Sequence, residues 1–303
     1  MKAIEGKLRS RYQTEHKVMR EWNPLDGTVP EYDTVKRWNR FDGSVSQIRK
    51  TEGYAVRSFR ELIDEVAAVT VNNRQYEMFY RGQAREYMDS RGTYYAGRSP
   101  KTTVYPSICR PGLKADGTPQ YRIRRQEVEA RYARLHRLVK AFCRGRSLPA
   151  EVCIALFQHY GIVATPFIDI TQSLRVAATF ALRSSQKGYL YVFGLPFPNQ
   201  SISYFYDLGI VLLKLQNICP VEAKRPRYQE GYLVGKFPYN MRKEGEDNLA
   251  RRLVAKFCLD NTDGTFWDEH FSPMPDEVLF PADDPIEQRL RDGAEQILSE
   301  AGL

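Results

Sequence analysis

The 303-residue chain carries 45 Lys and Arg residues against 37 Asp and Glu residues, which gives a formal net charge of +8 at pH 7. Its hydrophobic fraction of 42% is typical of a globular protein, and no apolar run approaches the about 20 residues that cross a bilayer. The N-terminus lacks the apolar core of a signal peptide, and the five cysteines have neither metal nor redox spacing. We therefore expect a cytoplasmic protein with reduced thiols, no metal site and no membrane contact; the basic charge is compatible with a nucleic-acid partner.

Residues 1–52 differ from the rest of the chain because they contain a repeat. The sequence Trp-Asn-Pro-Leu-Asp-Gly-Thr-Val at residues 22–29 returns as Trp-Asn-Arg-Phe-Asp-Gly-Ser-Val at residues 38–45. An aromatic residue and an Asp-Gly turn before a β-branched residue are typical of a tight hairpin. We predict an N-terminal β-hairpin extension over residues 1–52, either packed on the main domain or used to bind a partner. One mixed domain should fill residues 53–303, because no linker rich in Pro, Gly or Ser interrupts it.

The first elements of this domain are a helix, a strand and a long loop. Ser58 and Glu61 form a capping box before apolar residues at helical spacing, so residues 59–69 should form a helix. Residues 78–80 are predicted to form a buried strand that ends at Arg81 and Gly82. The segment 84–103 is predicted to be a loop in which basic residues alternate with tyrosines: Arg85, Tyr87, Arg91, Tyr94, Tyr95, Arg98 and Lys101.

Helices and strands alternate in the remainder. Residues 121–144 have the strongest helical pattern, with one apolar face and one arginine-rich face for which solvation is the ordinary outcome. Further helices are predicted at 147–157 and 173–182, and strands at 189–193, 211–215 and 232–234. Asp284 should cap a last helix that has Pro285 in its first turn. The pattern predicts an α+β fold.

Polar side chains are concentrated between residues 156 and 171, within an apolar surround. Burying such groups without partners costs roughly 2–7 kcal/mol each, so they should bond one another or face a ligand. Residues 80–83 are a second such place, and together the two segments predict a ligand cleft. Phosphate-binding glycine loops, dinucleotide fingerprints, zinc-spaced histidines, hydrolase elbows and kinase signatures are all missing from the sequence.

Several short segments, in order along the chain, resemble the motifs of the FRG domain family. Phe-Tyr-Arg-Gly-Gln at 79–83 is similar to the motif that names the family, and Pro-Ser-Ile-Cys-Arg at 106–110 is similar to its Pro-Ser-x-x-Arg element. Gln-His-Tyr-Gly at 158–161 and Thr-Pro-Phe-Ile-Asp-Ile-Thr at 165–171 resemble its central motifs, although Pro166 and Ile170 replace the usual arginine and tryptophan. The small-residue helix at 177–181, Pro-Arg-Tyr-Gln-Glu-Gly at 226–231 and Phe-Pro at 280–281 complete the resemblance.

The resemblance implies an ADP-ribosyltransferase-like fold, with a split β-sheet core, surrounding helices and NAD bound as a substrate between two small sheets. It also implies a toxin or phage-defence setting. For NAD cleavage we expect the catalytic residues to be Glu230, which supplies a carboxylate that the family often lacks at this point, with Gln229 as its alternative, together with His159 and Arg81. The expected NAD-binding residues are Arg81, Gly82, Gln83, Tyr105, Ser107, Arg110, Gln158, His159, Tyr160 and Thr171. Among them, Tyr105 or Tyr160 is expected to stack on nicotinamide, and Thr171 to donate to an anion.

Each role has a structural alternative. Arg81 can pair with Asp169, His159 can be a satisfied core residue, and Asp169 is better suited to organise its neighbours than to catalyse. Three functions stay open: an ADP-ribosyltransferase whose acceptor is nucleic acid (RNA favoured, through loop 84–103) or protein, an NAD glycohydrolase, and a non-catalytic binding module. If the activity harms a host cell, a neutralising protein partner is expected, with its contact at residues 22–45.

Overall fold

The computed structural model describes residues 45–71, 73–74, 76–89, 100–112, 123–144, 148–236 and 248–300. The predicted hairpin repeat lies outside these ranges except for Val45, which begins the short helix α3 (Val45–Ile48). The chain forms two compact units. Unit 1 comprises Met1–Val104, Leu174–Phe197 and Leu249–Pro273, and unit 2 comprises Tyr105–Ser173, Pro198–Asn248 and Met274–Leu303.

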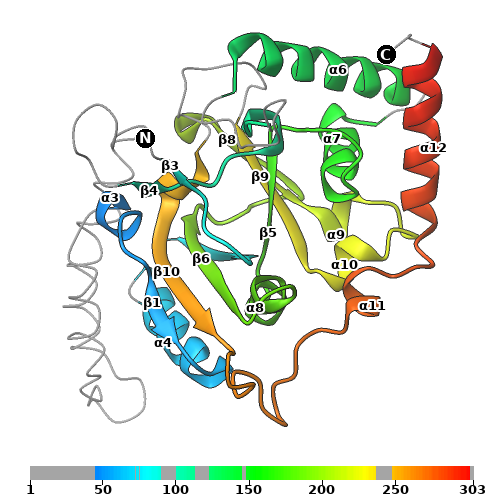
Figure 1. The fold of residues 1–303 in the computed structure, drawn as a ribbon. Coiled ribbons are helices and arrows are strands. Elements are labelled where there is room, and N and C mark those ends of the chain that lie inside the picture. The colour runs from blue at the N-terminus through cyan, green and yellow to red at the C-terminus, as the bar shows by residue number, and fades with distance from the viewer. Residues whose placement is uncertain are drawn as a thin grey trace. The chain divides into compact units, whose positions relative to one another are not determined.

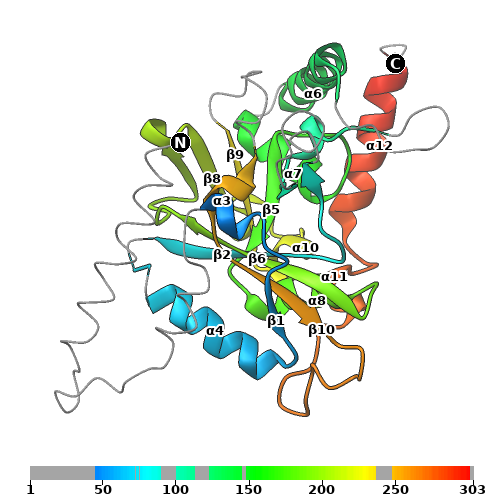
Figure 2. The same cartoon turned by 60° about the vertical axis from the view of Figure 1, so that its left-hand side comes forward.

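Unit 1 contains a mixed four-stranded sheet in the order β1 (Tyr54–Val56), β10 (Leu253–Asp260), β6 (Lys187–Leu195) and β2 (Glu77–Gln83). The pair β1–β10 is parallel, and the other two pairs are antiparallel. Helices α4 (Phe59–Val71) and α8 (Leu174–Leu182) bury one face of this sheet (Figure 1, Figure 2). Alternate residues of the strands supply that core, as expected for a sheet with one covered face.

The capping box at the start of α4 is present in a modified form. The Ser58 hydroxyl accepts a hydrogen bond from the main-chain N–H of Glu61 at 3.1 Å. The Glu61 carboxylate accepts the N–H of Arg57 at 3.0 Å, whereas a capping box predicts that it accepts the N–H of Ser58, one residue later. The predicted helix is therefore confirmed, and it runs two residues beyond residue 69.

The other face of the unit 1 sheet carries buried polar side chains beside Phe79 and Phe193. Arg81, Tyr191 and Lys256 are neighbours across three strands. The fully buried Lys256 ammonium donates to Glu86 Oε1 at 2.6 Å, to Thr102 Oγ1 at 2.9 Å and to a main-chain carbonyl. These bonds fasten the predicted loop 84–103 to β10. The loop contains a small antiparallel pair, β3 (Met88–Asp89) with β4 (Lys101–Thr102), and residues 90–99 lie outside the described ranges.

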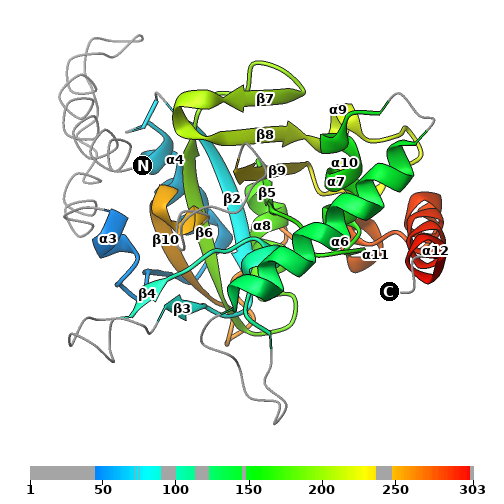
Figure 3. The same ribbon diagram turned by 90° about the horizontal axis from the view of Figure 1, so that it is seen from above.

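Unit 2 contains an antiparallel sheet in the order β5 (Phe167–Thr171), β9 (Gly231–Lys236), β8 (Ile210–Lys214) and β7 (Ile202–Phe205). Figure 3 shows β7, β8 and β9 side by side. Its core also includes the helices α6 (Arg125–Cys143), α7 (Ala150–His159) and α12 (Pro285–Glu300). The remaining short helices of this unit are η2 (Ser107–Cys109), η3 (Tyr206–Leu208), α9 (Leu215–Ile218), α10 (Arg225–Tyr228) and α11 (Asp276–Leu279).

The α+β prediction is confirmed, with eight strands in these two groups and several helices. The predicted helix 147–157 begins at Ala150 and extends to His159, so Gln158 and His159 occupy its last turn. Asp284 caps α12 as predicted, because its Oδ1 accepts the N–H of Ile286 at 3.0 Å. Strands β1, β3, β4, β7 and β10 were not predicted, nor were the short helices, which include η4 (Leu249–Arg252). All five cysteines are free thiols, and within the described ranges no helix has the length and apolar character to cross a membrane.

Candidate functional site

A histidine–aspartate pair lies in unit 2, between the end of α7 and the middle of β5. His159 Nδ1 lies 3.0 Å from Asp169 Oδ1, and the two side chains are 3% and 35% exposed. The other ring nitrogen of His159, Nε2, is buried and has no hydrogen-bond partner among the described residues. Leaving such a group unpaired costs about 1–3 kcal/mol, and a buried unpaired polar atom indicates a place for an ordered water or a ligand.

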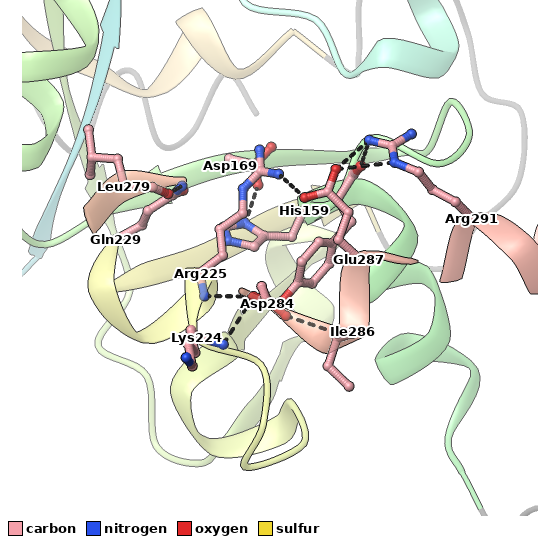
Figure 4. A network of polar contacts seen from close by, with 11 residues as sticks. His159, Asp169, Lys224, Arg225, Gln229, Leu279, Asp284, Ile286, Glu287 and Arg291 are labelled. Carbon is pink, nitrogen blue, oxygen red and sulfur yellow. Dashed lines mark hydrogen bonds and ion pairs between the residues drawn. The ribbon is translucent and has the colours of Figure 1, made fainter. Parts of the chain in front are cut away.

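Gln158 holds the same aspartate from the other side. Its Nε2 donates to Asp169 Oδ2 at 2.6 Å, so both carboxylate oxygens of Asp169 are engaged (Figure 4 shows the His159 bond). Its Oε1 accepts bonds from the hydroxyls of Ser107, at 3.3 Å, and Thr165. The predicted residues Ser107, Gln158 and His159 are thus brought together. Asp169 organises them, which is the role that the sequence favoured for it.

Glu230 lies on a strained turn next to this pair. It has φ 45°, the only positive φ of a non-glycine residue in the described part of the chain. The Thr171 hydroxyl bonds the main-chain carbonyls of Gln229 at 2.9 Å and Glu230 at 3.1 Å, and so stabilises the turn. Gly231 follows, and a Cβ added there would lie 3.4 Å from His159 Cε1. The Glu230 side chain is exposed and makes no hydrogen bond or ion pair to described residues.

Two of the predicted residues on this side have structural contacts. The Gln229 side-chain amide is buried and donates to the main-chain carbonyl of Leu279 at 2.7 Å (Figure 4). Of the two candidate side chains, Gln229 and Glu230, only that of Glu230 is exposed. The Thr171 hydroxyl also accepts the N–H of Ser173 at 3.0 Å. The Thr171 hydroxyl proton is donated to main-chain carbonyls of the turn. It therefore stabilises the turn at Glu230 instead of donating to an anion as predicted.

Tyr160 also has structural contacts, the alternative that the sequence left open beside stacking. Its ring is 1% exposed, so no ring face is accessible for the predicted stacking on nicotinamide. Its hydroxyl donates to Asp284 Oδ2 at 2.7 Å, and burial together with this carboxylate raises the pKa of Tyr160. Asp284 Oδ2 also accepts the N–H groups of Lys224 and Arg225, at 3.1 and 3.0 Å (Figure 4). Tyr160 and Asp284 therefore fix the start of α10.

Arg225 is a residue of this site that the sequence did not single out. Its guanidinium lies 4.7 Å from the ring centroid of Phe280 and 5.6 Å from that of Tyr160. Figure 4 shows it beside Asp169, above His159. Its Nε is buried without a partner among the described residues, and burial lowers its pKa. The side chain pairs with Glu287 only at 3.6 Å. A guanidinium with unused N–H groups is suited to donate hydrogen bonds to an anion.

No sequence signal distinguished Arg225, because the resemblance lies in its neighbours Pro226 and Arg227. The motif residue Arg227 is structural, since its Nη1 donates to the carbonyls of Pro220 and Ala223 at 2.9 and 2.6 Å.

The predicted residues Arg81, Gly82 and Gln83 belong to β2 in unit 1. A Cβ on Gly82 would lie 1.8 Å from the carbonyl oxygen of Ala177, so this glycine allows β2 to pack on α8. Arg81 and Gln83 project to the opposite face. There Gln83 Oε1 and the Tyr191 hydroxyl are buried without partners among the described residues, and burial raises the pKa of Tyr191. This face of unit 1 is a second place with orphaned polar atoms.

A cavity of about 490 Å³ lies in unit 2, and the predicted residues Tyr105 and Arg110 are not among the described residues that line it. Ser107 and Gln158 line it, together with Arg131, Arg134 and residues 161–164. Arg110 is exposed, and its Nε donates to the carbonyl of Tyr105 at 2.8 Å. Arg131 was expected on a solvated face of α6. Instead its Nη1 donates to the carbonyls of Ser107, Ile108 and Arg110, at 3.1, 3.2 and 2.7 Å.

A comparison with protein families matches residues 76–189 to the FRG domain. The matched segment contains Arg81, His159 and Asp169, whereas Arg225 and Glu230 lie beyond it. No curated protein and no solved structure matches the chain.

Proposed function

We propose, with the FRG domain at residues 76–189 as the premise, that the chain is an NAD-dependent ADP-ribosyltransferase with the corresponding fold, acting as a toxin or defence effector. The observation that carries the proposal is the arrangement in unit 2, where the strained, exposed Glu230 precedes Gly231, at which an added Cβ would lie 3.4 Å from His159 Cε1. Residues in sparsely populated backbone conformations are concentrated at functional sites, and Glu230 was the first choice for catalysis from the sequence.

The residues suit the electrostatics of NAD cleavage, in which positive charge develops on the ribose. An exposed carboxylate at Glu230 stabilises that charge or takes a proton from the acceptor. His159, oriented by Asp169, has Nε2 free to accept a ribose hydroxyl proton. Arg225, with its buried Nε unpaired, adds a donor for phosphate oxygens.

In unit 1, the polar face around Arg81 has the donors and acceptors that a dinucleotide requires. The unpaired Gln83 Oε1 and Tyr191 hydroxyl supply an acceptor and a donor that no described residue satisfies. Arg81 itself is suited to phosphate or ribose oxygens because its guanidinium is planar and bidentate. We infer that Arg81→Ala abolishes NAD-dependent activity while unit 1 stays folded.

Nucleic acid, RNA in particular, is the favoured acceptor. The described part of the loop 84–103 presents an exposed arginine–tyrosine pair, with the Arg85 guanidinium 5.6 Å from the Tyr87 ring centroid and Tyr87 49% exposed. Such pairs combine phosphate contact with base stacking. RNA binding that stays constant from about 50 to 300 mM salt would contradict the proposal, because phosphate contacts release counterions. A protein acceptor is the competitor.

An NAD glycohydrolase is the second candidate, since the exposed Glu230 carboxylate is open to water. Incubation with labelled NAD and separate RNA, DNA and protein fractions, read by mass spectrometry, separates the two functions. Labelled adducts support transfer, and free ADP-ribose alone supports hydrolysis. A thermal shift with NAD but no turnover indicates a non-catalytic binding module, because saturation at 100 times Kd stabilises by about 2.7 kcal/mol.

A transferase that harms its host cell requires a neutralising protein partner. The repeat at residues 22–45 remains the proposed contact for such a partner, and deletion of residues 1–44 tests it by co-purification from the native host.

A further inference from the structure

The charged side chains that line the cavity of about 490 Å³ in unit 2 are basic. Arg131 and Arg134 of α6 line it, and no acidic side chain is among its lining residues in the described part of the chain. Its volume lies within the range of small-molecule sites, roughly 300–1,000 Å³. The cavity is therefore large enough for an organic anion.

The two arginines differ in how they are held. Arg131 is fixed through Nη1 by three carbonyls around η2, and its Nε and Nη2 make no hydrogen bond to described residues. Arg134, one turn further along α6, is exposed and has no hydrogen bond or ion pair within the described ranges. A guanidinium held in place by one nitrogen with free donors on the others is pre-organised for a phosphate.

Another part of the lining is mostly apolar. It is formed by the turn after α7, where Ile162, Val163 and Ala164 are half-buried. Among the described residues, the main-chain N–H groups of Val163 and Ala164 have no acceptor. Ser107 and Gln158 also line the cavity. A lining that combines two arginines with apolar residues and free main-chain N–H groups matches a ligand that combines a phosphate with a flat organic group.

We propose that this cavity binds a nucleoside monophosphate, with its phosphate on Arg131 and Arg134 and its base or ribose on residues 162–164. The nucleotide is either free or the 5′-phosphorylated end of an RNA chain. Gln158 lines the cavity and also holds Asp169, so the bound nucleotide is one side chain from the His159–Asp169 pair. The proposal does not depend on NAD turnover.

The test is calorimetric titration of the full chain with AMP at about 50 mM salt. We expect Arg134→Gln to weaken AMP binding about tenfold, because it removes one charge-assisted contact. Arg137→Gln is the matched control, since Arg137 is an exposed arginine of the same helix that does not line the cavity. It should change the AMP affinity less than twofold. Adenosine and inorganic phosphate should each bind more weakly than AMP.

Three results would overturn the proposal: equal AMP affinity in Arg134→Gln and wild type, adenosine binding as tightly as AMP, or loss of AMP binding in Arg81→Ala with Arg134→Gln unaffected. The last result would place AMP at the unit 1 face instead. A 5′-phosphorylated trinucleotide that binds at least as tightly as AMP, with its 5′-hydroxyl form weaker, supports an RNA end as the ligand. Tighter binding of AMP supports a free nucleotide.

Discussion

At the scale of single residues, Glu230 combines an unfavourable backbone with an unused carboxylate. Its φ of 45° is costly for any residue with a Cβ, and the Thr171 hydroxyl is what supports it. Neither feature is explained by packing, because the side chain is exposed. This is the pattern expected of a residue retained for function at the expense of stability.

Glu230→Gly should therefore stabilise the protein while it removes the proposed activity. Glycine adopts positive φ without a steric penalty, so we expect a gain of about 0.5–1 kcal/mol in the free energy of unfolding. Chemical denaturation measures this gain, and NAD turnover measures the loss of activity. A variant that is less stable than wild type would show that the Glu230 side chain stabilises the turn.

Asp284 is the residue on which the local structure of the site depends most. It is buried, its Oδ2 accepts three donors, and its Oδ1 caps α12. Asp284→Asn should lower the free energy of unfolding by about 2–3 kcal/mol, because an amide cannot accept at both positions. The neighbouring Asp283→Asn is the control: Asp283 makes an exposed pair with Lys224, and its loss should have little effect. Similar losses in both variants would contradict this account.

The sequence located the polar residues of unit 2 but not what each one bonds. Gln158, His159 and Asp169 were identifiable because polar groups inside an apolar run require partners. Arg225 was missed because its importance comes from Phe280 and Tyr160, which lie far away in sequence. Pairings of this kind depend on tertiary packing, which periodicity does not encode.

At the scale of elements, the close approach of β2 and α8 explains the glycine of the Arg-Gly motif. A Cβ at Gly82 would lie 1.8 Å from Ala177 O and 2.6 Å from Ala181 N, and backbone atoms cannot move aside as side chains do. From the sequence, Gly82 was assigned to ligand binding. A glycine that allows a strand to pack closely on a helix cannot be distinguished in the sequence from one that allows a ligand to approach. The packing role is visible only when the helix is in place.

Gly82→Ala should accordingly destabilise the protein by more than about 2 kcal/mol, as expected when a methyl group is forced into a packed contact. Gly112→Ala provides the control, because nothing lies within 4 Å of a Cβ at that position. Urea denaturation of both variants measures the difference. If Gly82→Ala is as stable as Gly112→Ala, the strand and the helix are not in close contact.

Strand β10 shows why some elements were not predicted. Lys256 interrupts an otherwise apolar run and resembles a surface residue in the sequence. In the structure it is fully buried and neutralised by Glu86, which lies 170 positions away. Because the partner of Lys256 is so distant in sequence, no local sequence pattern identifies β10 as a buried strand.

At the scale of the whole molecule, each unit is assembled from three stretches of the chain. No single position in the sequence separates the two units, so a search for a linker finds none. The same interleaving means that residues of the FRG match lie in both units.

Stability should fall at alkaline pH because buried acids resist ionisation. Burial raises the pKa of the Cys219 thiol to about 12, above its value in the unfolded chain of roughly 8.5. Between about pH 9 and 12 the unfolded state releases a proton that the native state retains, so the free energy of unfolding decreases by about 1.4 kcal/mol per pH unit for each such group. Tyr160 and Tyr191, whose pKa values are also raised by burial, add to this above pH 10.

Denaturation curves between pH 8 and 10.5 measure this slope in wild type and in Cys219→Ala. The variant should lose stability less steeply with rising pH, whatever its stability at pH 8. Identical slopes would show that the thiol ionises in the folded protein as easily as in the unfolded chain.

The measurement that tests the central proposal most directly is the steady-state kinetics of NAD consumption by wild type, Glu230→Gln and Glu222→Gln. Glu222 is an exposed glutamate of the segment before α10, so its variant carries the same change of charge. We predict that Glu230→Gln lowers kcat by at least about 100-fold with KM within about threefold, and that Glu222→Gln resembles wild type. NAD consumption by Glu230→Gln at the wild-type rate, or no consumption by wild type with any acceptor fraction or with water, would contradict the account.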